Sequence, residues 1–234
     1  MRRYLSVFLI VFQLSSCAQL QQVVENLPQV PQAPPIDIAS GLREALTVGI
    51  DKQVSKLTQQ DGFLKNESVK ILLQGDLKKV DKALRNIGLS SLADEGLKVL
   101  NRAAEDAVKE ATPIFISAVK DITFDDAKTI LLGDNTAATE YLTTKTEDAL
   151  YQKFNPVIKQ SFSKVGADKI WDNLIQKYNT IPFTKPVNTN LTDYVTTEAL
   201  KGVYKMIATE EEQIRTRLSS RTTTLLQQVF KLQD

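Results

Sequence analysis

The sequence has 234 residues and a formal net charge of +1, and 42% of the residues are hydrophobic, enough for one packed core and a single main domain. Its 29 basic and 28 acidic residues are interleaved along the chain, which argues against nucleic acid as a partner. The complete absence of histidine excludes Ser-His-Asp triads, Cys-His pairs and the common zinc sites. Any catalysis would have to use carboxylates, lysine, serine or a metal ion held by oxygen ligands, and no cofactor or metal ion is expected.

The N-terminal segment has the layout of a secretory signal peptide. Basic Arg2 and Arg3 precede an apolar run over residues 4–14, and two serines follow. The run is shorter than the roughly 20 residues that a membrane-spanning helix needs. A cleaved signal peptide over residues 1–16 is therefore favoured over a retained transmembrane anchor.

The segment Leu14-Ser15-Ser16-Cys17 resembles the lipobox of bacterial lipoproteins, in which the cysteine is joined to lipid before the signal is removed. The resemblance implies a diacylglycerol and a further N-linked acyl chain on Cys17, and each buried methylene contributes about 0.8 kcal/mol to membrane binding. A membrane is the expected partner of this anchor. An ordinary secreted protein with a chance cysteine is the alternative.

Residues 17–36 are expected to be the lipidated cysteine and a flexible tether. The segment is rich in Gln, Val and Pro, and its four prolines exclude a regular helix. Because Cys17 is the only cysteine, the domain that follows cannot form an internal disulfide and depends on its packed core.

The helical domain is expected over residues 37–234. Its first helix starts at Ile38, carries apolar residues at helical spacing as far as Leu57, and ends at Asp61-Gly62. The apolar stretch 69–73 is either extended or a half turn. Asp76 is then expected to cap a second helix, which ends at Gly88 and has an apolar face of Leu77, Val80, Leu84 and Ile87.

A third helix is expected to start near Ser91 and to continue past Val108 until Pro113 breaks or kinks it. Thr123 is expected to cap the next helix, with Asp126 three residues later as a variant of the capping box. This short helix ends at Gly133.

The last third of the sequence predicts helices over 136–164, with a kink or break at Pro156, and over 167–178. A loop with Pro182 and Pro186 leads to a long helix over 191–217 and a final helix over 220–231. No strand signal is present. We therefore expect an all-α fold, a single domain of about eight helices.

The polar group Asn101, Arg102 and Glu105 lies on a helix that is otherwise rich in alanine. Such a group either binds a ligand or forms an internal hydrogen-bond network that fixes the register in which neighbouring helices pack. The sequence leaves both interpretations open.

The acidic candidates have structural explanations too. Asp125 and Asp126 complement the helix dipole in a first turn. Glu211 and Glu212 precede Arg215 by four and three residues, so both can pair with it along one helix face. The functional alternative is a divalent ion held by these carboxylates, although the spacing of a calcium loop is not met.

Serine chemistry has only weak support. Two Ser-x-x-Lys sequences occur, at 117–120 and 161–164, but the Ser-Asp-Asn and Lys-Thr-Gly motifs that accompany this spacing in penicillin-binding enzymes are missing. We therefore expect that the protein is not an enzyme.

Several segments together resemble a family of bacterial exported proteins and lipoproteins catalogued as domain of unknown function 4197. The segments are Asp61-Gly62-Phe63, Asn101-Arg102-Ala103-Ala104-Glu105, Thr123-Phe124-Asp125-Asp126-Ala127, Ala137-Ala138-Thr139 with Tyr141, Tyr194-Val195-Thr196, Ala199-Leu200 with Gly202, Glu211-Glu212 with Ile214-Arg215, and Arg221-Thr222-Thr223 with Leu225-Leu226 and Val229-Phe230. The sequence departs from the family pattern at 71–74 and at Leu218, where prolines are common. The resemblance covers residues 40–230 and implies a helical, exported, membrane-tethered domain without an assigned activity.

These observations predict an envelope lipoprotein that binds an envelope protein or a small apolar ligand through a polar-rimmed surface. The residues of that surface are Asn101, Arg102, Glu105, Tyr141, Arg215 and Arg221, with Asp125, Asp126, Glu211 and Glu212 as further candidates. Ala18 after the cysteine resembles the sorting pattern for the outer membrane, facing the periplasm. The alternatives are a hydrolase that uses the four carboxylates around a divalent ion, and a structural spacer without a ligand.

Overall fold

The computed structural model divides the chain into two units, Met1–Pro35 and Ile36–Asp234, and describes residues 37–86, 88, 90–179 and 190–233 of the second. The expected signal peptide, Cys17 and the tether lie outside the described residues, as do Ile87 and the loop with Pro182 and Pro186. The side chain of Leu84 is also outside this description.

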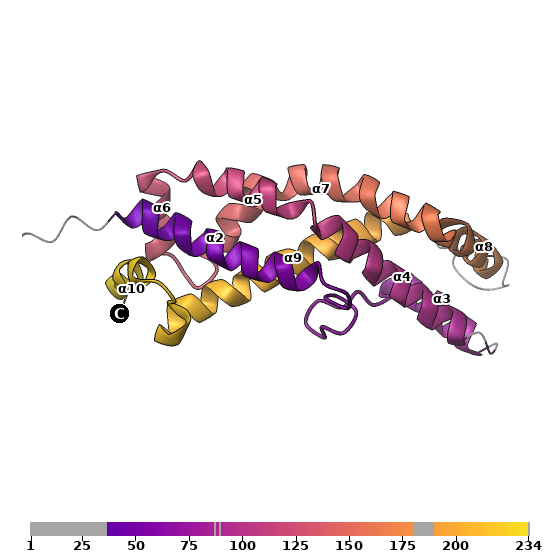
Figure 1. The fold of residues 1–234 in the computed structure, drawn as a ribbon. Helices are drawn as coiled ribbons and strands as arrows, with labels where there is room; N and C mark the ends of the chain where they lie inside the picture. Colours follow the sequence, from indigo (N-terminus) through magenta and orange to yellow (C-terminus); the bar gives the residue numbers. More distant parts are fainter. Residues whose placement is uncertain (1–36, 87, 89, 180–189, 234) are drawn as a thin grey trace, which may run out of the picture. The chain divides into compact units, whose positions relative to one another are not determined.

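The expected all-α fold is confirmed, and no strand occurs in the described ranges (Figure 1). The elements in chain order are α2 (Ile38–Leu57), α3 (Gly75–Asn86), α4 (Ser90–Val108), α5 (Ala111–Lys120), α6 (Phe124–Leu132), α7 (Ala137–Val165), α8 (Ala167–Asn179), α9 (Leu191–Thr216), the 3-10 turn η1 (Leu218–Ser220), α10 (Thr224–Phe230) and the 3-10 turn η2 (Lys231–Gln233).

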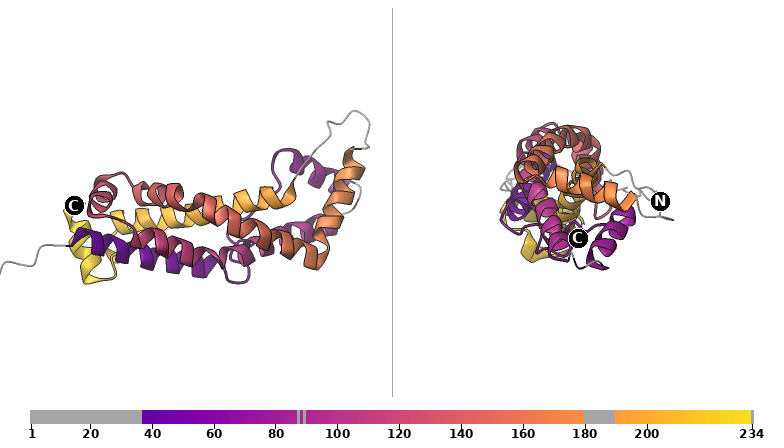
Figure 2. Two further views of the ribbon diagram at one scale, coloured as in Figure 1. Left: turned by 90° about the horizontal axis from the view of Figure 1, so that it is seen from above. Right: turned by 90° about the vertical axis from the view of Figure 1, so that its right-hand side faces the viewer.

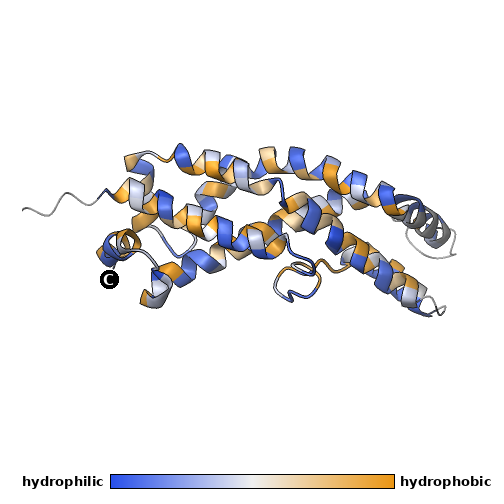
Figure 3. Cartoon of the chain, viewed as in Figure 1, coloured by the Kyte–Doolittle hydropathy of each residue, from blue (hydrophilic) through white to orange (hydrophobic). Residues whose placement is uncertain are grey.

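The core is formed by long helices that pack along one another. Helix α7 packs against α4 and α9, and α2 packs against α5, α6, α9 and α10 (Figures 1 and 2). Hydrophilic and hydrophobic residues alternate along the long helices in Figure 3, as expected for amphipathic helices. The fully buried side chains include Phe63, Phe115, Phe154 and Phe162, and burying each contributes about 1.5–3 kcal/mol.

The expected start of α6 is confirmed. Thr123 Oγ1 accepts a hydrogen bond from the Asp126 N–H at 3.1 Å, and the Asp126 carboxylate accepts one from the Thr123 N–H at 3.0 Å. This reciprocal pair is a complete capping box. Gly133 follows the last residue of α6, also as expected.

The structure moves the end of the third predicted helix and excludes a break at Pro156, one of the two predicted outcomes there. The third predicted helix ends at Val108, before Pro113, which lies in the first turn of α5, where its missing N–H costs no helical hydrogen bond. Pro156 does not end α7, because buried Phe154 and Ile158 hold both halves of the helix in the core while Pro156 is exposed.

Two predicted helix starts are also corrected. Helix α3 begins at Gly75, which has a positive φ of 55°, so Asp76 lies inside the helix and is not its cap. The last helix begins at Thr224 with Thr223 as its N-cap, and residues 218–220 form η1 instead. Arg221 explains why this helix begins later than predicted, because its buried side chain bonds the end of α9.

None of the helices in the described part of the chain is both long and apolar enough to cross a membrane.

Candidate functional site

The structure separates the candidate residues into three groups instead of one surface. One group on α4 contains Asn101, a second at the end of α9 contains Arg215, and a third around Tyr141 faces a groove between α5 and α7. Asp125 and Glu212 are exposed and belong to none of them. The single polar-rimmed surface expected from the sequence is therefore wrong as a geometric arrangement.

The buried Asn101 amide holds the segment that follows α2. Its Oδ1 accepts a hydrogen bond from the Ile71 N–H at 2.8 Å, and its Nδ2 donates to the Ile71 carbonyl at 3.0 Å and to the Leu97 carbonyl at 2.8 Å. The residue is 0% exposed. The amide thus replaces the backbone partner that the buried Ile71 peptide groups would otherwise lack.

Glu105 holds the turn between α2 and that segment. Its Oε1 accepts a hydrogen bond from the Phe63 N–H at 3.1 Å, and its Oε2 accepts one from Arg102 at 2.6 Å. Arg102 also pairs with Asp61 at 2.5 Å, a residue with a positive φ of 71°. Phe63 packs on Gly202 of α9, where an added Cβ would lie 2.8 Å from the ring. The α4 group is thus an internal network.

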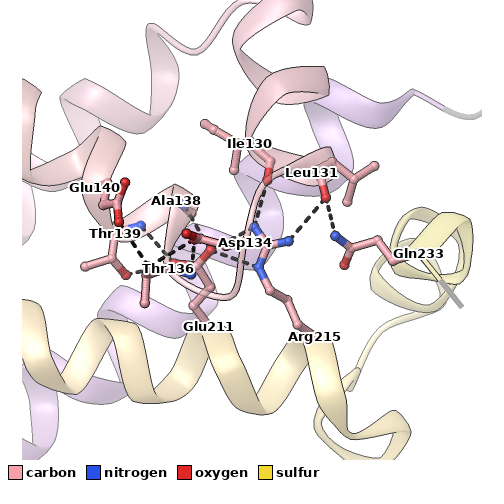
Figure 4. A network of polar contacts seen from close by, with 10 residues as sticks. All are labelled: Ile130, Leu131, Asp134, Thr136, Ala138, Thr139, Glu140, Glu211, Arg215 and Gln233. Carbon is pink, nitrogen blue, oxygen red and sulfur yellow. Dashed lines mark hydrogen bonds and ion pairs between the residues drawn. The ribbon is translucent and has the colours of Figure 1, made fainter.

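The second group joins the ends of three helices (Figure 4). The buried Glu211 carboxylate accepts hydrogen bonds from the Ala138 N–H at 2.9 Å, the Thr139 N–H at 2.8 Å and the Thr139 hydroxyl at 2.8 Å. These groups form the first turn of α7, where a negative charge complements the helix dipole. Glu211 therefore acts as an N-terminal cap supplied by another helix.

Arg215 bonds the C-terminal end of α6. Its guanidinium donates to the Ile130 carbonyl at 2.8 Å and the Leu131 carbonyl at 3.2 Å, in the last turn of α6. It also donates to Glu211 at 2.8 and 2.9 Å. The expected pair between Arg215 and Glu211 is present, and Glu212 instead points to solvent.

Arg221 fastens the C-terminal segment to the same place. It donates to the Ile214 carbonyl at 3.0 Å and the Arg215 carbonyl at 2.9 Å at the end of α9. The guanidinium carbons of Arg221 and Arg215 lie 5.9 and 6.0 Å from the ring centre of Phe230, within the range of a cation–π interaction. Gln233 completes the cluster by donating to the Leu131 carbonyl.

The third group lines a groove of about 740 Å³ between α5, α7 and the start of α6. Its apolar lining comes from Pro113, Ile114, Ala118 and Ala149. Its charged lining comes from the acids Glu110, Asp121 and Asp126 and from Lys145 and Lys153 of α7. A second hollow of about 400 Å³ between α6 and α7 shares Asp126 and Tyr141 with the groove. Tyr141 thus lies where the two meet.

Tyr141 keeps an unused hydrogen-bonding group at this junction. The ring is half-buried, with Lys145 Nζ 5.6 Å from its centre. Burial raises the pKa of Tyr141, and the carboxylates of Asp126 and Asp121 raise it further, so the hydroxyl is protonated at neutral pH. Its hydroxyl forms no hydrogen bond with another described residue. The hydroxyl is therefore free to bond a ligand.

The four carboxylates of the hydrolase alternative are not brought together. Asp126 is engaged by Thr123, whose N–H and hydroxyl lower the pKa of Asp126, and Glu211 is engaged by Arg215. Asp125 and Glu212 are exposed. Across the described ranges, no group of three acidic or thiol side chains is placed to hold a metal ion. Ser117 of the first Ser-x-x-Lys sequence lines the groove, and no hydrogen bond joins it to Lys120 in the described part. Ser161 of the second sequence bonds Asp106 at 3.4 Å.

The sequence reasoning found Tyr141 and Asp126 but missed most of the groove. Residues 141, 145, 149 and 153 repeat every four positions along α7, and this spacing places them on one face of the helix. Glu210, which precedes the predicted site residue Glu211, is a buried acid that bonds Lys52 at 2.5 Å and Gln53. An i, i+4 search of the α7 face would have found the lysines.

Comparison with known proteins gives one result. A family model described as protein of unknown function (DUF4197) matches residues 33–231. No curated protein matches the chain, and no solved structure does.

Proposed function

The chain belongs to the family of proteins of unknown function DUF4197, and we propose that it is an envelope lipoprotein that binds a partner through the groove at Tyr141. In this proposal Cys17 carries the lipid anchor, the domain faces the periplasm from the outer membrane, and no reaction is catalysed. The observation that carries the binding role is the free Tyr141 hydroxyl at the junction of two hollows.

The groove differs from the other two groups in having unused polar side chains. Lys153, Glu110 and Asp121 line it, yet none of them forms an ion pair with another described residue. The side chains of Asn101 and Glu211, by contrast, are fully engaged within the fold. A binding site for a partner needs polar side chains that are not already paired within the fold, and the groove contains such side chains.

The chemistry of the groove favours a protein segment over a small apolar ligand. Its lining combines the acidic side chains of Glu110 and Asp121, the basic side chains of Lys145 and Lys153, and apolar residues of α5 and α7. A segment of an envelope protein with an apolar residue between charges of both signs complements this lining. A small apolar ligand would leave these charges unpaired.

The direct test is photo-crosslinking in cells. A photoreactive phenylalanine analogue replaces Ala149, which is exposed and lines the groove, in the full-length protein. The control carries it at Glu147, which is exposed on the same helix but does not line the groove. We expect one defined crosslinked protein at position 149 that is absent at position 147 and lost on Tyr141→Ala. Equal crosslinking at both positions would reject the groove as the binding site.

Native mass spectrometry of the mature protein, extracted in mild detergent, tests the small-ligand alternative. An organic adduct of defined mass, lost on Tyr141→Ala and retained on Glu212→Ala, would replace the protein partner by a small ligand at the same groove. A bare mass together with no specific crosslink would contradict the binding role and leave a spacer.

The anchor is tested separately. Cys17→Ser is expected to prevent labelling by radioactive palmitate and to release the protein from the membrane fraction. Unchanged membrane association of this variant would reject the lipoprotein proposal without affecting the groove.

A further inference from the structure

Exposed large apolar side chains gather in three short elements. Seven such side chains occur in the described residues, and four of them lie on α6, η1 and η2. These four are Phe124, Leu132, Leu218 and Leu232, which are between 51% and 69% exposed. Leaving side chains of this size in water forfeits the free energy of burying them, so an apolar environment would favour these four side chains.

The three leucines lie around one hydrogen-bond cluster. The Leu131 carbonyl accepts from both Arg215 and Gln233 (Figure 4). Leu132 directly follows Leu131, and Leu232 directly precedes Gln233. Leu218 lies three residues after Arg215, in the turn that leaves α9. Segments far apart in the sequence therefore present their exposed leucines from one part of the fold.

This part of the fold is also where the chain enters the domain. Helix α2 begins at Ile38, and both α6 and α10 pack against it. Gly41, in its first turn, lies against Val229 of α10, since an added Cβ would overlap that side chain. Figures 1 and 2 show α6, α10 and the start of α2 at the same end of the helical unit.

Each of the four exposed apolar residues on α6, η1 and η2 has a basic residue close to it in the sequence. Lys128 lies four residues from both Phe124 and Leu132, so the three follow one face of α6. Arg217 directly precedes Leu218, and Lys231 directly precedes Leu232. Lys128, Arg217 and Lys231 are exposed and form no ion pair with another described residue. Two exposed acids, Asp125 and Asp134, also lie on or beside α6.

From this arrangement we propose that the end of the domain formed by α6, η1 and η2 rests on the surface of the anchoring membrane, with its apolar side chains in the lipid interface. The proposal depends on the lipid anchor at Cys17. Paired apolar and basic side chains are typical of protein surfaces that bind anionic lipid interfaces.

Because the tether keeps the domain close to the membrane, weak contacts are sufficient to hold the α6 end at the membrane surface. Residues 18–36 connect the anchor to α2, and this length of chain reaches at most about 68 Å when fully extended. The α6 end is thereby held at high local concentration near the bilayer. The far end of α7, at Val165, lies about 42 Å along the helix axis from Ala137.

The experiment uses the full-length lipidated protein in vesicles of phosphatidylcholine and phosphatidylglycerol. Because Cys17 is the only cysteine and lipid occupies its thiol in the proposal, one introduced cysteine carries a polarity-sensitive fluorophore. The test variants are Phe124→Cys, Leu218→Cys and Leu232→Cys. The control is Val165→Cys, whose parent side chain is 57% exposed, as is that of Phe124.

We expect a blue shift of the fluorophore, and loss of its emission with quencher-labelled lipids, at the three test positions but not at 165. A protein that floats with the vesicles while all four positions behave alike would overturn the membrane contact and leave the anchor intact. A protein that does not float would overturn the anchor and, with it, the contact. A blue shift that appears without vesicles and grows with protein concentration would assign this surface to a second copy of the chain instead.

Discussion

Glu211 and Arg215 lie one turn apart on α9. Glu211 bonds the N-terminal end of α7, and Arg215 bonds the C-terminal end of α6. The Glu211 carboxylate accepts from the first N–H groups of α7, while the Arg215 guanidinium donates to the last carbonyls of α6. The two side chains also pair with each other at 2.8 Å in the interior. One ion pair thus satisfies backbone groups that would otherwise be buried without partners.

Glu211→Ala is expected to lower the free energy of unfolding by about 3–5 kcal/mol, because it leaves Arg215 buried without its counter-charge. Urea denaturation measures the loss. The control is Glu212→Ala, an exposed neighbour, for which the change stays within about 0.5 kcal/mol. Similar losses for both variants would contradict the role assigned to Glu211.

Asn101→Ala is expected to free the segment around Ile71 from α4. The substitution leaves the buried N–H and carbonyl of Ile71 unpaired, and each such group costs about 1–3 kcal/mol. Hydrogen exchange measures the faster exchange at Ile71, and urea denaturation measures the lost stability. Exposed Lys98 on the same helix provides the control, Lys98→Ala, with unchanged exchange at Ile71. Unaltered protection of the Ile71 N–H from hydrogen exchange in Asn101→Ala would contradict the role assigned to Asn101.

Gly202→Ala and Gly49→Ala are expected to have opposite effects on stability. A Cβ at 202 would lie 2.8 Å from the buried Phe63 ring, which costs about 1–3 kcal/mol of overpacking. A Cβ at 49 would meet only Glu210 Cγ at 3.4 Å, beside a cavity of about 20 Å³. In a helix, Ala is favoured over Gly by about 1 kcal/mol, so Gly49→Ala is expected to be neutral or stabilising.

Thermal unfolding of the two variants distinguishes these effects. A gain in melting temperature for Gly202→Ala would show that the contact between Phe63 and Gly202 is looser than the structure gives.

The capping box of α6 is expected to make stability depend on pH. The Thr123 N–H and hydroxyl hold the pKa of Asp126 below its ordinary value of 3.8. The carboxylate therefore contributes its full stabilisation above about pH 4, and this is lost as the pH falls through 3.8 toward the folded-state pKa. We expect the difference in melting temperature between the natural protein and Asp126→Asn to be constant at neutral pH and to vanish in acid. A difference that persisted at low pH would mean that the charge of Asp126 is not what stabilises the cap.

Most of the helices could be predicted because their signals are local. Apolar residues at helical spacing located α2, α4, α7 and α9, and Thr123 with Asp126 located the start of α6 within four residues of sequence. The errors arose where a distant contact overrides a local preference. Pro156 stays inside α7 because packing on both sides holds the helix, and Arg221 delays α10 because its side chain bonds the end of α9.

The site was predicted less well than the fold for the same reason. Asn101, Glu105, Glu211 and Arg215 attracted attention as polar groups, but the sequence could not tell whether their partners were ligands or backbone groups. Apart from neighbours on their own helices, those partners are backbone groups and the Thr139 hydroxyl, between 30 and 85 residues away. Only the packing of α4 and α9 brought them together.

The sequence by itself determined that the described chain is helical, where most helices begin and end, and that no histidine or disulfide chemistry operates in it. These properties follow from residue type and from spacing within one or two helical turns. The tertiary structure decided which polar side chains form hydrogen bonds with helix ends and which remain unpaired in the groove at Tyr141. Hydrogen bonds and burial depend on groups that approach in space, and this approach is set by how the helices pack.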